Sequence, residues 1–418
     1  VLPQESLRDF SWHSKKRCNP LELVPEKKSA IGKHQAMKQP PRYSLDTELI
    51  ASGISRWVEI ESPSYDPVAV NLMMDAASSF MNEMGARIER IPGSGNLGDV
   101  VTARFGPIST PGILVLGHLD TVHLVGTLQE TLPIRMEGDR LYGPGMMDMK
   151  GGMYIAAHAL GHVLEEYGPL SAPITFMFIP DEEIGSPTTR QLIENEAKRS
   201  RWVLVPEPAH DGKVVTGRHA FLRYTITVHG KAQHAGVAHG LGKSAISGMA
   251  RLISEIEDFS DIEREVTYRV GVVNGGHFVN VVPTECTAQV LCVAPSSAAF
   301  DEISMRMQSL SCNDSDITVE VHPGPVRPLF KPTAGTLALL RIAEKVASGI
   351  GLELKHGQFG GGSDGNFTGS IGVATLDGLG VHGDGLHTKS EHLYMSSLVP
   401  RTKLLAGLYR ALSDISTS

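Results

Sequence analysis

The chain has 418 residues, of which 41% are hydrophobic, and a net charge of −8 at pH 7. This length allows two domains with separate cores. The sequence has no basic stripe and only 6% aromatic residues, so nucleic acid is excluded as an expected partner and a small-molecule substrate is favoured.

The sequence predicts a cytoplasmic protein that does not bind membranes. No stretch approaches the roughly 18 continuous apolar residues of a membrane span. The first 30 residues lack the apolar block of a secretory signal. Four cysteines in a chain of this length, with no CxxC spacing, are typical of a reducing compartment.

Residues 1–44 form a basic, proline-containing segment with little periodicity of apolar residues, and we expect this segment to lie outside the main fold. Helices are then predicted at residues 50–58 and 67–84. The second helix has Asp66 as its cap and Gly85 at its end.

Apolar runs predict buried strands, with one helix between the second and the third run. The strands are expected at residues 100–105, 113–116, 174–179 and 202–205, and the helix at residues 153–167. From residue 217 the character changes, because apolar and polar side chains alternate at residues 222–228 as in a half-buried antiparallel strand.

A helix and two strands complete this inset, and helices follow it. In the inset, the helix is expected at residues 244–259 and the strands at residues 265–273 and 288–293. After it, helices are expected at residues 337–346 and from Pro400 onward. The predicted fold class is α/β. A main domain with a mostly parallel sheet flanked by helices comprises residues 45–216 and 328–418, and an inserted α+β domain comprises residues 217–327.

His118 and Asp120 directly follow one of the predicted strands. Open α/β sheets carry their sites at the carboxyl ends of the strands. At this spacing His118 can bind a metal while Asp120 holds the other ring nitrogen. A surface hydrogen bond between the two is the alternative.

Asp148 stands in a glycine-rich turn, residues 143–152, that leads into a helix. Glycines let backbone approach a ligand closely, and a carboxylate can bridge two cations through its two oxygens. A phosphate-binding loop would also be glycine-rich, but the Walker spacing is absent. We therefore favour a metal-bridging role for Asp148.

Glu182 and Glu183 follow the strand at residues 174–179. Adjacent side chains leave the backbone in different directions, so one can bind metal while its neighbour moves protons. An acidic turn in solvent is the alternative, but it explains poorly a pair that interrupts so apolar a strand.

Glu207 follows the strand at residues 202–205, and His387 lies late in the chain. With His118, Asp148 and Glu183 they form a nitrogen and oxygen donor set that suits two divalent ions sharing one carboxylate. Zinc is the first expectation, and manganese and cobalt remain open. Two such ions can activate water and polarise a carbonyl.

In their order and placement these motifs resemble the two-metal aminoacylase and carboxypeptidase family of metallopeptidases and amidohydrolases, most closely its bacterial glutamate carboxypeptidase branch. The resemblance extends over residues 45–412. It implies that the main domain is catalytic, that the inset is a dimerisation domain, and that the protein is a homodimer or a higher homo-oligomer.

Carried over residue by residue, the resemblance implies two ions with a shared bridge, a general base and an orienting acid. It implies His118 and Glu207 on one ion, Glu183 and His387 on the other, Asp148 as the bridge, Glu182 as the base and Asp120 as the acid that orients His118.

The resemblance also implies residues outside the ligand set. His234 lies in a segment similar to the one whose histidine reaches the active site of the partner subunit and stabilises an oxyanion. Asn280 resembles the family's substrate-contacting asparagine. Ser363 lies in a turn, residues 361–364, that resembles the pocket-lining turn of the family.

One departure concerns the substrate. Where the glutamate carboxypeptidase branch carries an arginine that grips the substrate carboxylate, this chain has Val293. Arginine is the residue best shaped for that contact. Arg327, Arg218, His219 and His277 are the candidates to replace it.

The sequence therefore predicts a metal-dependent hydrolase that cleaves a C–N bond in a small molecule, by default the amide of an N-acyl amino acid or a dipeptide. The missing arginine raises an alternative, hydrolytic deamination of an electron-poor aromatic amine such as 5-nitroanthranilate, which is the chemistry of the nitroanthranilate aminohydrolase of this family. A third hypothesis is an inactive binding homologue, although every matching metal position is chemically competent.

Overall fold

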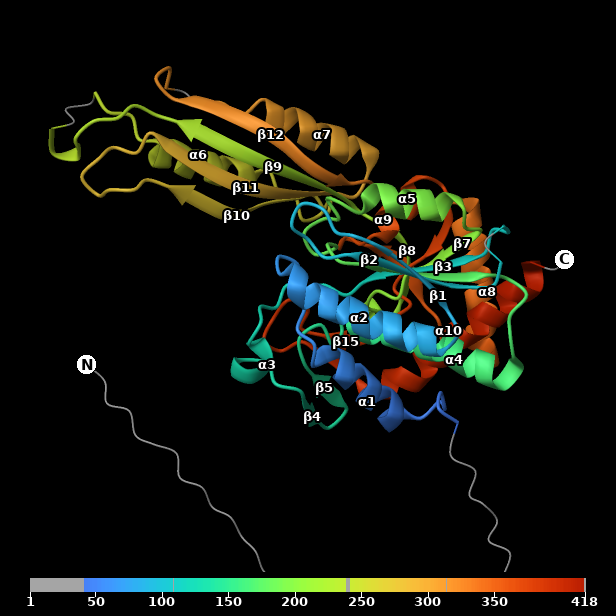
Figure 1. Ribbon diagram of the computed structural model, residues 1–418. Helices are drawn as coiled ribbons and strands as arrows, with labels where there is room; N and C mark the ends of the chain where they lie inside the picture. Colours follow the sequence, from blue (N-terminus) through green and yellow to red (C-terminus); the bar gives the residue numbers. More distant parts are fainter. Residues whose placement is uncertain (1–40, 108, 238–240, 313, 417–418) are drawn as a thin grey trace, which may run out of the picture. The chain divides into compact units, whose positions relative to one another are not determined.

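The computed structural model describes residues 41–107, 109–237, 241–312 and 314–416 (Figure 1). The extension predicted at residues 1–44 lies almost wholly outside these ranges. Within them, no helix has both the length and the apolar composition needed to cross a membrane.

A central sheet carries the residues of interest. Among the described residues it has six strands, in the order β1-β2-β6-β3-β7-β14. Strands β6, β3, β7 and β14 run parallel to one another. At one edge β2 pairs antiparallel with β6, and β1 pairs antiparallel with β2. The strands are β1 (Arg87–Ile91), β2 (Val100–Phe105), β3 (Ile113–His118), β6 (Ile174–Ile179), β7 (Trp202–Leu204) and β14 (Ala374–Leu376).

Both faces of this sheet are buried, as is usual for parallel strands. Ile113 and Val115 of β3 pack into a larger core, whereas Leu114 and Leu116 face a smaller one. Figure 1 shows α1, α2, α4 and α10 on one side of the sheet and α5 and α9 on the other. The helices of the two cores are α1 (Thr47–Val58), α2 (Pro67–Glu83), α4 (Lys150–Tyr167), α8 (Ala334–Gly349), α10 (Met395–Ser416), α5 (Arg190–Lys198) and α9 (Gly365–Ser370).

A second, antiparallel sheet has its own core. Its described strands lie in the order β10-β11-β9-β12. Alternate residues of β9, among them Leu222, Tyr224 and Ile226, pack against the two helices of this part. Its elements are β9 (Ala220–His229), α6 (Ala245–Asp258), β10 (Thr267–Gly275), β11 (Glu285–Ala294), α7 (Ser297–Gln308) and β12 (Thr318–Arg327).

Short elements complete the described chain. Strands β8 and β13 pair in parallel, and β15, β16, β5 and β4 form a small antiparallel sheet. These elements and the remaining helical turns are α3 (Thr127–Glu130), β4 (Arg135–Glu137), β5 (Arg140–Tyr142), η1 (His210–Gly212), β8 (Val214–Arg218), η2 (Ala235–Val237), β13 (His356–Phe359), β15 (Gly383–Asp384) and β16 (His392–Tyr394).

The predicted fold class, α/β with an α+β insertion, is confirmed. Helices and strands lie where the apolar patterns predict them, within a few residues. The pattern missed β1, because this strand at the sheet edge has the polar sequence Arg-Ile-Glu-Arg-Ile. The domain limits at residues 216–217 and 327–328 stay a prediction.

One predicted boundary was wrong, because α10 begins at Met395 and contains Pro400 within it. The first turn is held by Asp139, whose carboxylate accepts from the backbone N–H (2.8 Å) and the hydroxyl (2.6 Å) of Ser396. Leu398 is buried in the larger core. A proline in the interior of a helix removes one backbone hydrogen bond, and these contacts offset that loss.

Candidate metal centre and active site

The carboxyl ends of three parallel strands bring the predicted ligands together. His118 is the last residue of β3, Glu183 follows the end of β6, and Glu207 follows the end of β7. Because β3 pairs in parallel with both β6 and β7, these ends lie along one edge of the sheet. Asp148 comes from the turn before α4, and His387 from the loop between β15 and β16.

Asp148 lies between two groups of donor atoms. Its Oδ1 is 3.2 Å from Nε2 of His118, and its Oδ2 is 3.2 Å from Nε2 of His387. Glu207 completes the first group at 3.8 Å from His118, and Glu183 completes the second at 3.2 Å from His387. Within each group of described residues the ligand atoms lie within 4.8 Å of one another.

The charges of this cluster favour cations. Burial and the neighbouring Asp148 raise the pKa of Glu183 to about 8 and the pKa of Glu207 well above its ordinary value. Hydrogen bonds to Asp148 and Glu183 raise the pKa of His387 to about 11. Buried carboxylates that repel one another are stabilised by cations, so this donor set fits two divalent ions with Asp148 between them.

Asp120 holds two strand ends together. Nδ1 of His118 is 2.9 Å from the backbone carbonyl of Asp120 and 3.4 Å from its carboxylate. The carboxylate accepts from Ser64 Oγ (2.6 Å) and from the backbone N–H groups of Glu182 and Glu183 (3.2 Å each). Asp120 therefore fixes the Glu182–Glu183 turn against the end of β3, and its carbonyl is the nearer partner of the His118 ring.

Glu391 fixes the turn that carries Asp148. Its buried carboxylate accepts from the backbone N–H groups of Gly145 (3.1 Å), Met147 (2.9 Å) and Asp148 (3.1 Å). It also contacts Nε2 of His123 at 2.7 Å. Our sequence reasoning missed this residue, although it lies only four positions after His387.

Glu182 faces the first group of donors. Its Oε2 is 3.9 Å from Nε2 of His118, and its Oε1 is 2.7 Å from Nη2 of Arg327 at the end of β12. Asp364 contacts Nη1 of the same arginine at 3.0 Å. Arg327 thus holds one oxygen of Glu182 and leaves the other toward the histidine.

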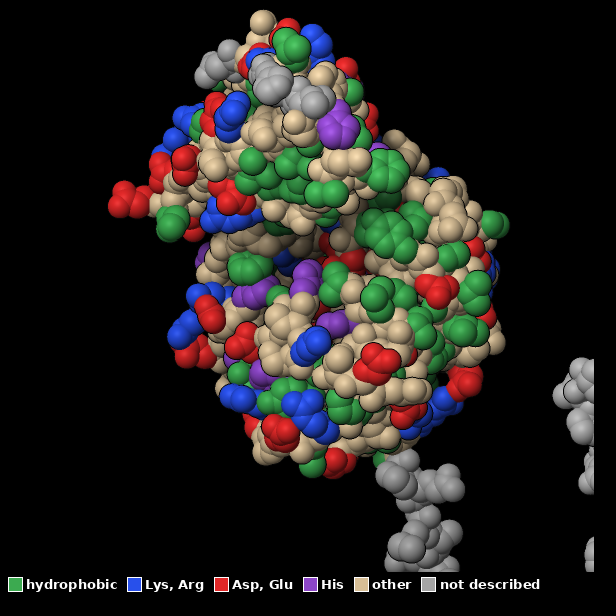
Figure 2. All heavy atoms as spheres, turned by 90° about the vertical axis from the view of Figure 1, so that its left-hand side faces the viewer, with side chains coloured by type: hydrophobic (Ala, Val, Ile, Leu, Met, Phe, Trp, Pro, Cys, Tyr) green, Lys and Arg blue, Asp and Glu red, His purple; other side chains and the backbone are tan. Residues whose placement is uncertain are grey.

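A cavity of about 370 Å³ opens beside these groups. Figure 2 shows a hollow with acidic and histidine side chains in it and at its rim. Our sequence reasoning missed several residues of its wall, which come from η1, from the end of β13 and from the open face of the second sheet. They are His210, Phe221, Arg223, Leu291 and Phe359.

Some predicted residues lie elsewhere in this chain. His234 and Asn280 are exposed and are absent from the described lining of the cavity. Ser363 is buried and donates to Asp377 (2.6 Å), the carboxylate that also binds Arg218 through two hydrogen bonds of 2.6 and 2.7 Å. The Ser363 hydroxyl therefore supports a lining residue from behind, and the roles of His234 and Asn280 stay predictions.

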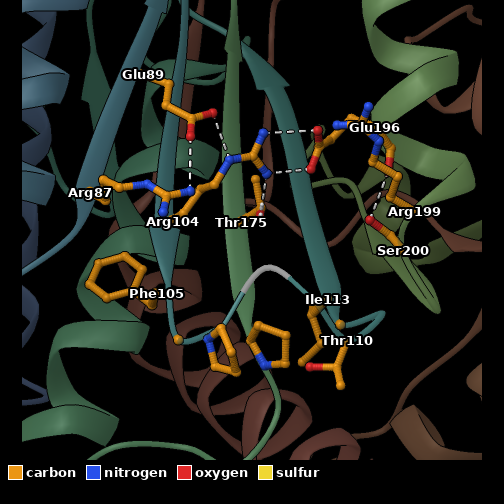
Figure 3. Close-up of a pocket in the computed structure, with 14 residues that line it drawn as sticks. Arg87, Glu89, Arg104, Phe105, Thr110, Ile113, Thr175, Glu196, Arg199 and Ser200 are labelled. Atoms are coloured by element: carbon orange, nitrogen blue, oxygen red, sulfur yellow. Dashed lines mark hydrogen bonds and ion pairs between the residues drawn. The ribbon is translucent and has the colours of Figure 1, made fainter.

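Another cavity, of about 240 Å³, lies at the opposite ends of the strands, where Ile113 begins β3 (Figure 3). Arg104 crosses it with its guanidinium between Glu89 (2.8 Å) and Glu196 (2.5 Å). Its central cation is therefore already paired, and none of the described donor groups that could hold a metal lies there. It is not the candidate catalytic site.

Comparison with known proteins agrees with this geometry. The family model for peptidase family M20/M25/M40 matches residues 114–411. Carboxypeptidase G2 of Pseudomonas sp. (strain RS-16) is 30% identical over 368 residues, which is 85% of this chain and 87% of that protein.

Two solved structures share the fold. A tripeptidase from Staphylococcus aureus has a TM-score of 0.71 at 18% identity, over 88% of this chain and 99% of that chain. An M20 family metallo-carboxypeptidase from Sulfolobus solfataricus has a TM-score of 0.67 at 16% identity, over 88% and 99% of the two chains.

Proposed function

Because this chain belongs to the peptidase family M20/M25/M40 and is a metal-dependent hydrolase, we propose that it cleaves the amide bond of a small N-acyl amino acid or dipeptide. The observation that carries this proposal is the position of Asp148, whose two oxygens point to two histidines from distant parts of the chain. The products are a carboxylic acid and an amine.

In this proposal each residue of the cluster has one role. His118 and Glu207 hold one ion, Glu183 and His387 hold the other, and Asp148 bridges them. Zinc is our first choice of metal, and manganese or cobalt suits the same donors. When bound, two such ions supply Lewis acidity toward a carbonyl oxygen and make water more acidic.

Glu182 is the proposed general base. Its carboxylate takes a proton from the attacking water and returns it to the leaving nitrogen. Its contact with Arg327 at 2.7 Å supports this role, because the guanidinium holds one oxygen and fixes the direction of the second. The neighbouring His118 lies 3.9 Å from that second oxygen.

The test compares Glu182→Ala with Asp148→Ala in metal-loaded protein. We expect Glu182→Ala to keep its metal content and to lose turnover by roughly 10²- to 10⁴-fold, because a proton carrier is removed and the ligands remain. Asp148→Ala should lose metal, because both ions share this carboxylate. Elemental analysis and amide hydrolysis measured on the same samples separate the two roles. Normal turnover in Glu182→Ala, or full metal occupancy in Asp148→Ala, contradicts the assignment.

A second candidate function has its own support in the cavity wall. Phe221 and Phe359 line the cavity, and the ring of His210 stacks on Phe359 with centroids 3.6 Å apart. Such a wall suits a flat aromatic substrate. The alternative reaction is hydrolytic deamination of an electron-poor aromatic amine such as 5-nitroanthranilate, in which water adds to the ring carbon that carries the nitrogen and ammonia leaves.

Product analysis distinguishes these functions. Metal-loaded protein is incubated with N-acyl amino acids, dipeptides and nitro-substituted aminobenzoates, with and without chelator, and the products are identified by mass spectrometry. An amine and an acid support amide hydrolysis, whereas a hydroxybenzoate with free ammonia supports the aminohydrolase. No turnover of any compound favours the inactive binding homologue.

We also propose that two chains associate through the second sheet. Strand β10 lies at the edge of that sheet, and exposed apolar side chains gather on it and on the following loop. They are Val272 (43% exposed), Val273 (47%), Phe278 (73%), Val279 (101%) and Val281 (42%). An exposed edge with such side chains is a common site of pairing with a second copy.

A further inference from the structure

The second sheet presents a row of side chains to the catalytic cavity. Leu291 of β11 pairs directly with Arg223 of β9 on one side and with Arg269 of β10 on the other. Arg223 and Leu291 line the cavity together with Asp148, Glu182 and Glu183. Arg269 lines only the neighbouring open groove on the same sheet. One of two arginines in the same row therefore reaches the candidate active site.

Arg223 is the cavity arginine that has no partner. Its guanidinium makes no hydrogen bond or ion pair with any residue that the structure describes, and its Nη1 is buried from solvent. The other two are occupied, because Asp377 binds Arg218 through two hydrogen bonds and Arg327 contacts Glu182 and Asp364. Arg218 and Arg327, two of the residues expected from the sequence to replace the missing arginine, are thus already engaged.

The chain makes room for this guanidinium beside the proposed general base. A Cβ atom on Gly185 would lie 2.9 Å from both Cζ and Nη1 of Arg223. Gly185 ends the turn that carries Glu182 and Glu183, and its φ of +99° is one that glycine adopts readily. Glycine therefore lets the head of Arg223 lie directly against this turn.

The register of the second sheet places Arg223 near the position of the departure, Val293. In the register of β9 and β11, Val293 pairs with Phe221, two residues from Arg223 on the same face of the sheet. Diagonal neighbours of this kind are roughly 7–8 Å apart, within reach of long side chains. An arginine at 223 can thus reach part of the space that an arginine at 293 would reach.

We propose that Arg223 binds the carboxylate group of the substrate, in place of the arginine that is missing at Val293. This inference rests on the proposed function, because it concerns the substrate of the same cavity. Its physical basis is that a half-buried guanidinium whose Nη1 is buried without a partner is stabilised by a bidentate anion. Burial and then the nearby Arg327 lower the pKa of Arg223, and Glu182 acts against both.

The test uses pairs of substrates that differ only in the acid group. An N-acyl amino acid is compared with its primary carboxamide, and 5-nitroanthranilate with its carboxamide. We expect Arg223→Gln to lower kcat/KM for the acid by about 10- to 100-fold, mainly through KM, and to lower it much less for the carboxamide, so that the ratio of acid to carboxamide turnover falls. Arg223→Lys should retain part of the preference, because it keeps the charge and loses the bidentate geometry.

Arg269→Gln is the matched control. Arg269 stands in the same row, but its Nη1 donates to Ser260 (3.1 Å) and to the Tyr268 carbonyl (2.9 Å). Its substitution should leave the ratio of acid to carboxamide turnover unchanged. An unchanged ratio in Arg223→Gln, whether both substrates lose turnover equally or neither does, would show that Arg223 does not bind the carboxylate.

A binding measurement separates this inference from the proposed reaction. Benzoate and benzamide are titrated into chelator-treated protein and followed by ligand-observed NMR. Loss of benzoate binding in Arg223→Gln and not in Arg269→Gln supports the inference even if no substrate is turned over. Equal benzoate binding by wild type and Arg223→Gln overturns it, whatever the enzyme hydrolyses.

Discussion

Asp148 illustrates how much single residues contribute to this site. Each of its oxygens lies 3.2 Å from a different histidine, and its own position depends on the buried carboxylate of Glu391. His387, on the exposed side, has a φ of 59°, a region that non-glycine residues adopt at a cost. Backbone conformations of this kind cluster at functional sites, and this one fixes the direction in which the candidate ligand leaves the chain.

His210 gives a prediction at this scale. Burial and then Arg218 lower the pKa of His210 to about 4, from an ordinary value of 6.5. Between these two pH values the unfolded chain binds more protons than the folded chain, so stability falls as the pH drops through this window. We expect His210→Phe, which keeps a ring over Phe359, to lose less stability on acidification than wild type.

Urea unfolding of chelator-treated wild type and His210→Phe, at pH of about 7.5 and about 5, measures this difference. Chelation keeps the ligand groups in the same state in both proteins. The same loss of stability in both proteins would mean that His210 is not neutral in the folded state at the lower pH.

The residues that the sequence predicted and those that it missed differ in a physical way. His118, Glu183 and Glu207 could be found because each follows an apolar strand, and parallel strands end at one edge. Arg223 could not be found in this way, because the alternation of apolar and polar residues in β9 marks it only as a polar position. Its importance depends on the register with β11 and on the space left by Gly185. Both are features of tertiary structure that the local sequence pattern does not contain.

At the scale of elements, the boundaries depend on contacts from distant segments. The start of α10 could not be read from Pro400, because Asp139 holds the first turn from far away in the sequence. The capped helix α2 was predictable, because Asp66 accepts from the N–H groups of Val68 and Ala69 within the same segment. Local capping is visible in a sequence, whereas long-range capping is not.

The turn between β5 and α4 gives a prediction at this scale. Glu391 is a positioning residue, because it binds three N–H groups of the turn and does not touch the cavity. We expect Glu391→Ala to weaken metal binding by about 10- to 100-fold, since the turn that carries Asp148 loses its support. Saturating metal should restore much of kcat. Metal titration monitored by activity and by calorimetry measures both effects.

Glu196→Gln is the control for Glu391→Ala. Glu196 is also a buried glutamate, but it pairs with Arg104 at the opposite end of the sheet (Figure 3). Its substitution should lower stability without changing metal affinity. Equal changes in metal affinity in the two variants would mean that Glu391 acts through general stability alone.

At the scale of the whole molecule, the site is incomplete without a second copy if His234 has the role that the family resemblance implies. In this chain His234 forms a β-bridge with Val281, and Ala235 N–H donates to the carbonyl of Asn280 (2.9 Å). These residues form one exposed corner of the second sheet, away from the described lining of the chain's own cavity. Service to a neighbouring subunit therefore stays a prediction for these residues.

Complementation tests this arrangement. Glu182→Ala and His234→Ala should each be inactive alone. Mixed and reassembled, they should recover about a quarter of wild-type activity, because half of the dimers are mixed and each mixed dimer has one intact site. Native mass spectrometry confirms that mixed dimers have formed. Mixed dimers without activity, or full activity of His234→Ala alone, would exclude a role for His234 across the interface.

The dependence of Asp148 on Glu391 has a consequence for synthesis. A growing chain that has emerged only as far as α9 already contains His118, Asp148, Glu183 and Glu207, but neither His387 nor Glu391. Because the N-terminal part of a chain emerges and folds first, His387, the last ligand of the second group, and the support of the Asp148 turn arrive late. We therefore expect hydrolytic activity to be among the last properties that the nascent protein acquires. A chain released from the ribosome before His387 is made should be inactive.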